Sequence, residues 1–562
     1  MLSRTTRGHV HTLLDARTLV QAGDQPALIY LATDVAPQAI TQRAFVQTAR
    51  AYAAAIQALG IQPGDVVIVA QAQPLDSVFC FWGALLAGAV PSIFATLTEK
   101  LDPEIYRRSV RDLVKISGAR AVLASDNWAQ VPVEGLACEI HDLSQSEFVR
   151  NPASVGALEL PQPQPEAIAF LQHSSGTTGL QKGVALSHRA VLNQLANYSD
   201  ALDLRADDII VSWLPLYHDM GLIAGFLMPL IQGIPLVLMS PLDWVQHPAM
   251  LLRAIHDYRA TLCWLPNFAY NHCARRIRKR DSESLNLSSM RAFINCSEPV
   301  RHDSHLRFAE RFAENGVQMD MLAVSYAMAE NTFGVTQTTL GRHPRIDVVG
   351  AEALQRDNHA LPTSDTPALT FVSCGSPIGG TQLKIVDDQG HDLPERRVGE
   401  ILIKSDCMLT EYYRRPDLQP FNAEGWYQTG DRGYAVDEDV FVIGRSKDLI
   451  INAGKNIYPQ DVEAVVSEIE GIIPGRVAAF GVADEVEGTE LIAVIAETPI
   501  EDADGRLSLV RAIRQAIVEQ IAVTVTYVQM VEPRWLIKTS SGKVARRANR
   551  DKWLAQRQAG QS

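Results

Sequence analysis

The residues with the clearest chemical meaning form the stretch SSGTTGLQKG at positions 174–183, directly after the apolar run 167–171. Gly176 and Gly179 allow backbone conformations and a close approach to an anion that other residues do not. Successive backbone N–H groups in such a turn form an anion-binding nest. The hydroxyl donors and the positive charge of this stretch are Ser174, Ser175, Thr177, Thr178 and Lys182. These residues predict a loop that holds phosphate groups, and the alternative is a Ser/Gly-rich surface turn.

The stretch is not a Walker loop, in which GxxxxGK is followed by Ser or Thr. Here the lysine is followed by Gly183 and Val184. The stretch instead resembles the signature loop of adenylate-forming enzymes, the superfamily of acyl-CoA synthetases, fatty acyl-AMP ligases, luciferases and nonribosomal adenylation domains. The resemblance covers nearly the whole chain, because four further motifs follow in the family's order: SYAMAE (325–330), WYQTGD (426–431), GRSKD (444–448) and KTSSGK (538–543).

The resemblance implies that ATP activates a carboxylic acid, and that Mg²⁺ and lysines offset the charge between the carboxylate and the α-phosphate. Tyr326 would stack on adenine, Glu330 would hold Mg²⁺, and Asp431 would bond both ribose hydroxyls. Arg445 would also reach the ribose or a phosphate. The other residues of SYAMAE assigned to this nucleotide site are Ser325, Ala327, Met328 and Ala329. Taken alone, SYAMAE could be a helix start with an exposed glutamate, and Thr-Gly-Asp could be a plain turn.

Three lysines receive roles from the resemblance. Lys182, with the Thr177 and Thr178 hydroxyls, would hold the leaving pyrophosphate. Lys543 would bridge the carboxylate and phosphate oxygens during adenylation and leave for thioester formation. Lys447 matches the hinge about which the small C-terminal domain rotates. The alternative for Lys543 is a lysine on a solvated loop near a basic tail.

Three segments look closest to fatty acyl-AMP ligases: SWLPLYHDMGL (212–222), CSEPVR (296–301) and NIYPQDVE (456–463). By this resemblance His218 would lie beside the acyl carboxylate and the adenylate, where a neutral imidazole can position the acid. A lone histidine is otherwise often structural. The residues expected to line the adenine are Ser297, Glu298 and Pro299.

The stretch TLCWLPNFAYN (261–271) is apolar and aromatic, so it could form a wall of an acyl pocket. The residues predicted for this wall are Trp213, Trp264, Asn267 and Phe268. Core packing is the alternative for each of them.

Two features bear on the reaction. Ala329 stands where many family members have a threonine that bonds the α-phosphate, and a lost donor of this kind could cost about 2.7–4 kcal/mol. Fatty acyl-AMP ligases, however, often have alanine at this position. About forty residues separate Glu330 from the strand before Cys374. Fatty acyl-AMP ligases carry an insertion here, which is thought to hinder the rotation that CoA chemistry needs. In contrast, TTGLQKG looks more like the loop of a CoA synthetase, so the acceptor signals conflict.

Composition excludes several classes of protein. The chain has 562 residues, 47% hydrophobic and 20% charged, which indicates one large globular unit and one or two smaller ones. Its net charge of −13 argues against nucleic-acid binding. Seven scattered cysteines without a CxxC pair favour a reducing compartment over zinc or disulfides. The charged N-terminal residues lack the apolar core of a signal peptide, so we expect a cytoplasmic protein.

Two uncharged stretches, 77–97 and 221–239, reach the length of a membrane span. Glycine and proline near their middles fit a buried helix that turns into a buried strand better than a span. We therefore expect no membrane span.

Helix and strand patterns alternate along the chain. Residues 41–59 and 77–87 look helical, 65–70 and 89–94 look extended, and strand-like alternation returns at 382–386 and 399–403. Such alternation predicts an α/β fold with largely parallel strands. We expect packed α/β sheets with a small β lobe in a large N-terminal domain (1–445), followed by a small mobile α+β domain (446–562) that carries Lys543.

The expected reaction converts a hydrophobic carboxylate and ATP to acyl-AMP and pyrophosphate. The acyl group then passes to a phosphopantetheine thiol, either of CoA or of an acyl carrier protein. Two alternatives stay open: an enzyme that performs mainly the thioester step on a supplied acyl-adenylate, and an inactive nucleotide-binding partner. Nothing in the sequence identifies the acid, which could be a fatty acid or a polyketide starter.

Overall fold

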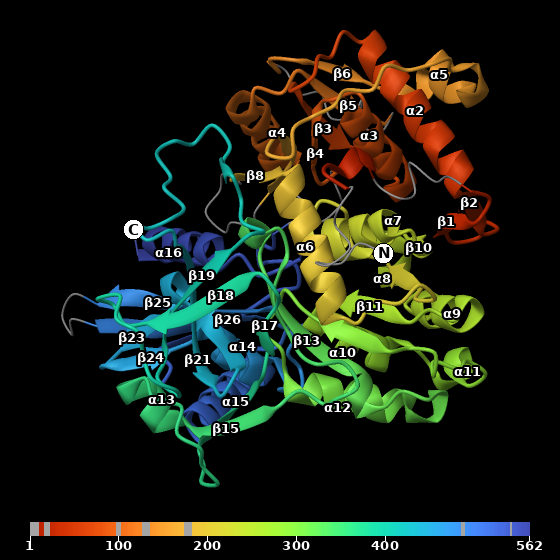
Figure 1. The fold of residues 1–562 in the computed structure, drawn as a ribbon. Helices are drawn as coiled ribbons and strands as arrows, with labels where there is room; N and C mark the ends of the chain where they lie inside the picture. The colour runs from red at the N-terminus through yellow and green to blue at the C-terminus, as the bar shows by residue number, and fades with distance from the viewer. Residues whose placement is uncertain are drawn as a thin grey trace.

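The computed structural model describes residues 10–15, 23–96, 103–125, 135–173, 182–484, 489–539 and 542–561. Two large mixed sheets with helices around and between them make up the greater part of the molecule (Figure 1). Smaller sheets follow in the chain. The expected α/β fold class and its β-rich lobe are therefore confirmed.

The first large sheet has nine strands in the order β17-β14-β13-β12-β11-β9-β10-β1-β2. Strands from β1 to β13 in this order run parallel, whereas β2, β14 and β17 are antiparallel additions at the edges. The strands are β1 (Pro26–Leu31), β2 (Gln38–Thr41), β9 (Ile210–Ser212), β10 (Leu236–Met239), β11 (Leu262–Leu265), β12 (Ala292–Asn295), β13 (Leu322–Ala327), β14 (Gly334–Gln337) and β17 (Ser376–Pro377).

The second large sheet has seven strands in the order β20-β8-β7-β4-β3-β5-β6. Its five strands from β7 to β6 run parallel, and β8 and β20 are antiparallel. The strands are β3 (Val66–Ala70), β4 (Val90–Ile93), β5 (Ala121–Ala124), β6 (Glu139–His141), β7 (Ile168–His173), β8 (Gly183–Ser187) and β20 (Glu411–Tyr412). The run VVIVA of β3 is buried at every position, as expected for a central parallel strand.

Helices cover the two sheets and fill the space between them. Phe81 of one helix contacts Phe170 of β7 at 5.5 Å and Phe226 of a π-helix at 6.0 Å, so the core is continuous between the sheets. The helices of this part are α2 (Gln42–Ala58), α3 (Pro74–Leu86), α4 (Pro103–Ser117), α5 (Glu147–Arg150), α6 (His188–Ala201), η5 (Met220–Leu227), α7 (Met228–Gln232), α8 (Pro241–Gln246), α9 (Ala249–Tyr258), α10 (Asn267–Arg276), α11 (Lys279–Ser282) and α12 (His302–Phe312).

Local sequence explains where these elements begin. Thr41 accepts a hydrogen bond from the Ala44 N–H at 3.2 Å and caps α2, and Ser187 caps α6 in the same way through Ala190. The stretch 221–239 forms η5, α7 and the buried strand β10, as the sequence predicts. In the part of the chain that the structure describes, no helix is long and apolar enough to cross a membrane.

Two antiparallel sheets follow. β18 (Thr381–Val386), β19 (Gly399–Ser405), β21 (Tyr427–Val436) and β22 (Asp439–Arg445) form a four-stranded sheet. The interval after Glu330 also contains a two-stranded unit, β15 (Ile346–Gly350) and β16 (Ala368–Val372), with α13 (Ala351–Asp357) between the strands. We call β15, α13 and β16 the inserted unit.

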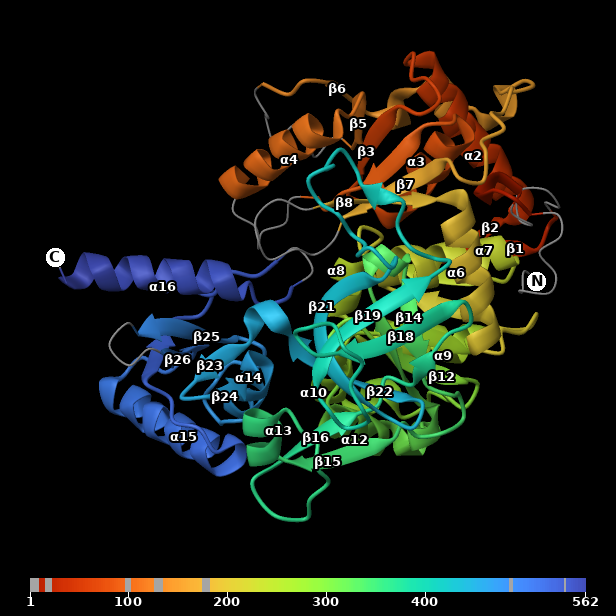
Figure 2. The ribbon, with the colours of Figure 1, turned by 60° about the vertical axis from the view of Figure 1, so that its left-hand side comes forward.

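The C-terminal elements gather on one side of the molecule (Figure 2). They include a hydrophobic cluster drawn from residues 450–530. The predicted boundary at residue 445 coincides with the end of β22, and the division into domains stays a prediction. The elements are β23 (Ile450–Asn452), β24 (Lys455–Ile457), β25 (Val477–Asp484), β26 (Thr489–Glu497), β27 (Tyr527–Val531), α14 (Pro459–Ser467), α15 (Ala503–Ile521) and α16 (Arg546–Gln561).

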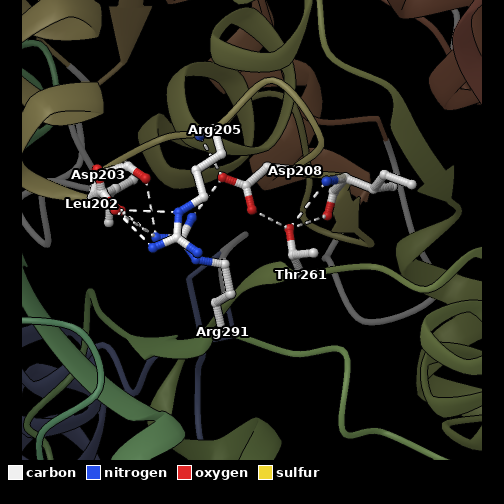
Figure 3. A network of polar contacts seen from close by, with 7 residues as sticks. Leu202, Asp203, Arg205, Asp208, Thr261 and Arg291 are labelled. Carbon is white, nitrogen blue, oxygen red and sulfur yellow. Dashed lines mark hydrogen bonds and ion pairs between the residues drawn. The ribbon is translucent and has the colours of Figure 1, made fainter.

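A buried ionic network joins the amino ends of three neighbouring strands of the nine-stranded sheet (Figure 3). Asp208, just before β9, is 1% exposed and accepts hydrogen bonds from Thr261 Oγ1 at 2.7 Å and Arg291 Nη1 at 2.6 Å. Thr261 and Arg291 directly precede β11 and β12. The network therefore fixes the edge of the sheet opposite to the carboxyl ends of these strands.

Candidate active site

Most predicted site residues of the large sheet lie just beyond the carboxyl ends of its parallel strands. His218 follows β9, Ser297 follows β12, and Glu330 follows β13. Parallel strands bring their carboxyl ends to one edge, where α/β proteins bind ligands. The site is thus separated from the stabilising network of Asp208 at the other edge.

Asp431 lies at the centre of the predicted ribose site. Its Oδ2 accepts a hydrogen bond from the Tyr326 hydroxyl at 2.6 Å, and its Oδ1 lies 3.2 Å from Arg445 Nε. The backbone of Gly430 has a φ of +70°, which glycine adopts readily, and the Asp431 N–H bonds Thr429 Oγ1 at 3.0 Å. Asp431 is 7% exposed and Tyr326 is 8% exposed, so this carboxylate is oriented before any ligand arrives.

Glu330 lies in the turn after β13, where an aromatic side chain connects it to Lys182. The Tyr412 hydroxyl donates to Glu330 Oε1 at 3.0 Å, and Lys182 Nζ lies 4.6 Å from the centre of the Tyr412 ring. The remaining members of the predicted phosphate loop lie outside the described residues. They are Ser174, Ser175, Gly176, Thr177, Thr178 and Gly179.

The surroundings of Glu330 fit Mg²⁺. Among the described residues, no group of three or more acidic, histidine or cysteine side chains forms a complete metal site. Glu330 Oε1 accepts one hydrogen bond, and no hydrogen bond to Oε2 is found in the described part of the chain. Mg²⁺ usually takes one or two carboxylates and completes its shell with water and substrate phosphates. A single carboxylate with one oxygen left to bind the ion is therefore suitable.

The rest of SYAMAE lies along and after β13. Ser325 donates to the Thr336 carbonyl at 2.9 Å, so its hydroxyl secures the neighbouring strand β14. Ala327 ends β13, and Met328 precedes the 3₁₀ turn η8 (Ala329–Asn331). Ala329 is 7% exposed and offers only a methyl group where many family members have a hydroxyl.

His218 and Asp219 form a close pair in the segment after β9. His218 Nδ1 lies 2.6 Å from Asp219 Oδ1, which is an ion-pair distance. The relative orientation of the two groups is not that of a hydrogen bond. Burial raises the pKa of Asp219, but His218, the Met220 N–H and Lys543 outweigh this effect and leave the pKa lowered. Asp219 therefore stays ionised beside the imidazole and the lysine.

Lys543 lies among charged residues of the large sheet's ligand edge. Burial lowers the pKa of Lys543, Arg445 lowers it further, and the carboxylates of Glu298 and Asp219 oppose both effects. The residue comes from the turn before α16, where the Thr539 N–H donates to the Lys543 carbonyl at 2.8 Å. Lys543 and Asp431 therefore share Arg445 as an electrostatic partner.

The segment expected to line the adenine adopts a constrained shape. Ser297 has a φ of +69°, a left-handed conformation that is costly for a residue other than glycine. Glu298 Oε2 accepts a hydrogen bond from the Phe268 N–H at 3.0 Å and so joins this motif to the start of α10. Pro299 is exposed. Such strain is typical of segments that are shaped for a ligand.

The predicted hinge region follows β22 directly. Lys447 lies in η9 (Ser446–Asp448), and burial, followed by Arg445, lowers the pKa of Lys447. Asp448 is bound by Arg546 Nη1 at 2.8 Å, and Arg546 also pairs with Glu463 at 2.7 Å. These ion pairs secure the hinge to the C-terminal elements.

The four residues predicted for the acyl wall divide into three environments. Trp213 stacks on Trp244 at 3.6 Å between ring centres, and the 41% exposed ring of Phe268 contacts both of them. Trp264 is 1% exposed and donates to the Tyr198 hydroxyl at 3.0 Å, which fits the core-packing alternative.

Asn267, the fourth residue of this set, serves a polar network. Its Oδ1 accepts from Asn295 Nδ2 at 3.1 Å and from the Arg301 N–H at 3.0 Å. These bonds tie the start of α10 to β12 and α12. Only Trp213 and Phe268 of the four therefore belong to one aromatic cluster, in which Phe268 is exposed and Trp213 and Trp244 are buried.

Tyr412, Tyr427 and Asp219 contact predicted site residues or one another, although the sequence predicts no role for them. Tyr427 lies in the motif WYQTGD and Asp219 in the motif SWLPLYHDMGL, beside residues with predicted roles. Their positions in these motifs could have predicted that they belong to the site. Tyr412 had no such signal, because its position depends on the pairing of β20 with β8.

The inserted unit contacts the C-terminal elements directly. Gln355 Nε2 of α13 donates to the Ile521 carbonyl at 2.8 Å, and Asn456 Nδ2 donates to Asn358 Oδ1 at 3.1 Å. A second contact comes from Arg301, the residue before α12. Arg301 pairs with Asp461 at 3.0 Å. These contacts join the C-terminal elements to the inserted unit and to the residue that precedes α12.

Comparison with known proteins gives consistent matches over this chain. The family model described as "AMP-binding enzyme" matches residues 16–413. A putative acyl-CoA synthetase of Caulobacter vibrioides is 31% identical and covers 97% of this chain and 95% of its own. The medium-chain-fatty-acid–[acyl-carrier-protein] ligase JamA of Moorena producens is 29% identical, over 98% of this chain and 94% of its own.

A solved structure from a study of fatty acyl-adenylate ligases from E. coli and L. pneumophila is also similar. It superposes with a TM-score of 0.89, at 28% identity, and the match covers 99% of each chain. The agreement extends over the N-terminal sheets and the C-terminal elements together.

Proposed function

Because this chain belongs to the AMP-binding enzyme family, we propose that it activates a hydrophobic carboxylic acid with ATP and transfers the acyl group to a phosphopantetheine thiol. In the first step, a carboxylate oxygen bonds to the α-phosphorus and the bond to pyrophosphate breaks. In the second step, the thiol sulfur bonds to the acyl carbon, the carbon–oxygen bond to AMP breaks, and the thiol proton passes to solvent.

The observation that carries this proposal is the place of Lys543. A lysine from the turn before α16 lies within electrostatic range of Glu298, Asp219 and Arg445, and Arg445 in turn pairs with the Asp431 carboxylate. A cation at this junction can bridge the acyl carboxylate and the α-phosphate, whose mutual repulsion is the main obstacle to adenylation. A lysine on a solvated loop would not be surrounded in this way.

The remaining groups supply the other requirements of the first step. The two oxygens of Asp431 accept hydrogen bonds from the ribose hydroxyls, and Tyr326 lies against the base. Lys182 offers positive charge to the leaving pyrophosphate. Glu330 would hold Mg²⁺, which supplies electrostatic stabilisation to the phosphates when it is bound.

The acid is proposed to be a fatty acid or another acid with a long apolar chain. The support is the aromatic cluster of Trp213, Trp244 and the exposed Phe268, together with the acyl substrates in the names of the relatives. His218, with its Nδ1 beside ionised Asp219, would orient the carboxylate.

We propose a carrier-protein thiol as the acceptor. The inserted unit is bonded to the C-terminal elements through Gln355 and Asn358, which fits the hindered rotation toward CoA chemistry that the resemblance to fatty acyl-AMP ligases implies. The name of the similar carrier-protein ligase points in the same direction. CoA is the other acceptor that the experiment includes.

A second candidate rests on Ala329. This buried methyl group provides no donor to the α-phosphate, so slow adenylation followed by efficient thioester formation on a supplied acyl-adenylate is the alternative division of the reaction.

The test supplies a panel of acids of increasing chain length with ATP and measures acid-dependent pyrophosphate exchange. CoA and a holo carrier protein are then offered separately, and the Lys543→Ala variant serves as the comparison. We expect exchange with long-chain acids, thioester formation on the carrier, and loss of exchange in the variant. Unchanged exchange in Lys543→Ala would refute the role of this lysine.

Two further outcomes decide between the alternatives. Thioester formed on CoA but not on the carrier would refute the proposed acceptor. Thioester formed only from supplied acyl-AMP would support the second candidate. Failure of the wild-type protein to catalyse either step would indicate the inactive nucleotide-binding partner.

A further inference from the structure

Residues 407–413 run between the turn that carries Glu330 and strand β8, which Lys182 directly precedes. On one side, the Leu409 N–H donates to the Glu330 carbonyl at 2.8 Å, and Thr332 Oγ1 donates to the Cys407 carbonyl at 2.7 Å. Thr332 has a φ of +63°, a strained conformation for a β-branched residue, so this turn is held firmly in place.

On the other side, the same segment pairs with β8. Tyr412 lies opposite Val184 in an antiparallel register, and the Tyr413 N–H donates to the Gly183 carbonyl at 2.8 Å. Lys182 immediately precedes Gly183, the first residue of β8. One short segment therefore fixes the backbone next to both the lysine and the carboxylate.

The Tyr412 side chain completes this connection. Its hydroxyl donates to Glu330 Oε1, an acceptor when ionised, and its one hydroxyl proton is then used. The Tyr427 hydroxyl, 3.0 Å away, must therefore be the donor to the Tyr412 oxygen. The Lys182 ammonium contacts the face of the same ring at 4.6 Å, within the range of a cation–π interaction.

This arrangement holds two opposite charges near one another without joining them. Lys182 and Glu330 form no direct ion pair, although each of these two described residues contacts Tyr412. A direct pair would have to be broken before either charge could bind a phosphate or a metal ion. Tyr412 is 6% exposed, so its ring and hydroxyl have little freedom to move away.

We propose that Tyr412 is a positioning residue. Before ATP binds, it keeps Lys182 and Glu330 apart and orients them toward the site of the triphosphate and its Mg²⁺. This inference rests on the proposed function. It differs from a packing role, since packing requires the ring but neither the hydroxyl nor the contact with the lysine.

Two substitutions separate the parts of this role. Tyr412→Phe keeps the ring under Lys182 and removes the hydrogen bond to Glu330, whereas Tyr412→Leu removes both. The matched control is Tyr434→Phe, because Tyr434 is also buried and also donates to a carboxylate, Asp347 Oδ2, at 2.9 Å. Tyr434 belongs to the hydrophobic cluster around the four-stranded sheet and the inserted unit, and it has no part in the proposed chemistry.

The measurement is MgATP binding by isothermal titration calorimetry without any acid, together with Mn²⁺ binding to the ATP complex by electron paramagnetic resonance. Thermal unfolding is recorded for every variant. We expect Tyr412→Phe to weaken MgATP and Mn²⁺ binding about tenfold, as the loss of one hydrogen bond to a charged group predicts. Tyr412→Leu should weaken both further, and Tyr434→Phe should lower Tm without changing either affinity.

The positioning role would be overturned if Tyr412→Phe bound MgATP and Mn²⁺ with wild-type affinity. It would also be overturned if Tyr434→Phe lost as much of these affinities as Tyr412→Phe. Because these readouts need no acyl substrate, they do not depend on finding the correct acid. If the wild-type chain itself failed to bind MgATP, the proposed function would fall first, and this inference with it.

Discussion

The Tyr326 hydroxyl lies 2.6 Å from Oδ2 of Asp431, although 105 positions separate the two residues in the chain. The bond joins the end of β13 to β21 and so connects the nine-stranded sheet to the four-stranded sheet. It also leaves Asp431 oriented between a phenol and a guanidinium before any nucleotide is bound.

Tyr326→Phe should therefore impair ATP binding more than catalysis. The variant keeps the aromatic ring beside the base and removes the hydrogen bond that orients Asp431. We expect KM for ATP in pyrophosphate exchange to rise about tenfold with a smaller change in kcat. A kcat loss with unchanged KM would show that the hydroxyl acts in the transition state instead.

Lys543 should impose an alkaline limit on adenylation. Burial first, and then Arg445, lower its pKa below the usual lysine value of 10.5, against the opposing effects of Glu298, Asp219 and the Cys296 thiol. The charged form is therefore present at low pH and is lost as pH rises through that lowered pKa. The rate of pyrophosphate exchange should therefore fall as the pH rises through the same range.

Lys543→Arg tests this assignment, because a guanidinium keeps its charge throughout this range. The variant is expected to be slower but to lose its alkaline limb, as measured by kcat/KM for exchange against pH. Coinciding alkaline limbs in the two proteins would assign the titration to another group.

Weakening the inserted unit should change the choice of acceptor. Gln355→Ala removes the bond to the Ile521 carbonyl, and Asn358→Gly removes the bond from Asn456 while tolerating the φ of +49° at this position. The double variant should form more thioester on CoA relative to acyl-AMP. Arg356→Ala, on the same helix and 53% exposed, is the control.

An unchanged ratio of CoA thioester to acyl-AMP in the double variant would mean that the inserted unit does not restrain the C-terminal elements. Both products can be separated chromatographically in a single reaction, so the ratio is independent of enzyme concentration.

Arg291→Ala should destabilise the fold without changing the chemistry of the site. It leaves the Asp208 carboxylate buried and without its main cation, which typically costs about 3–5 kcal/mol. Arg205→Ala is the control, because Arg205 lies at the surface of the same network and its side chain is 55% exposed.

Urea unfolding monitored by fluorescence should show a clear loss for Arg291→Ala and little change for Arg205→Ala. At a temperature where both variants are folded, KM for ATP should equal the wild-type value. A large KM change in Arg291→Ala would show that the amino ends of the strands are coupled to the site.

The alternation of apolar and polar residues predicted the principal elements well. The runs at 41–59 and 65–70 form α2 and β3, and the uncharged stretch 221–239 forms a buried helix and strand rather than a membrane span. These features are local, because a helix or strand period is visible within ten or twenty residues. The candidate wall of the acyl pocket was less predictable, since Trp213 and Trp264 look alike in sequence but lie in different surroundings.

By itself, the sequence determined the order of the motifs, the identity of the family and the residues that could perform the chemistry. Only the tertiary structure decided which of these residues come together: Asp431 with Tyr326 and Arg445, and Tyr412 with both Lys182 and Glu330. The physical reason is that these meetings depend on the order of strands in a sheet and on pairing between distant segments. Residue type and spacing act along the chain, whereas the site is formed where the carboxyl ends of separate strands come together.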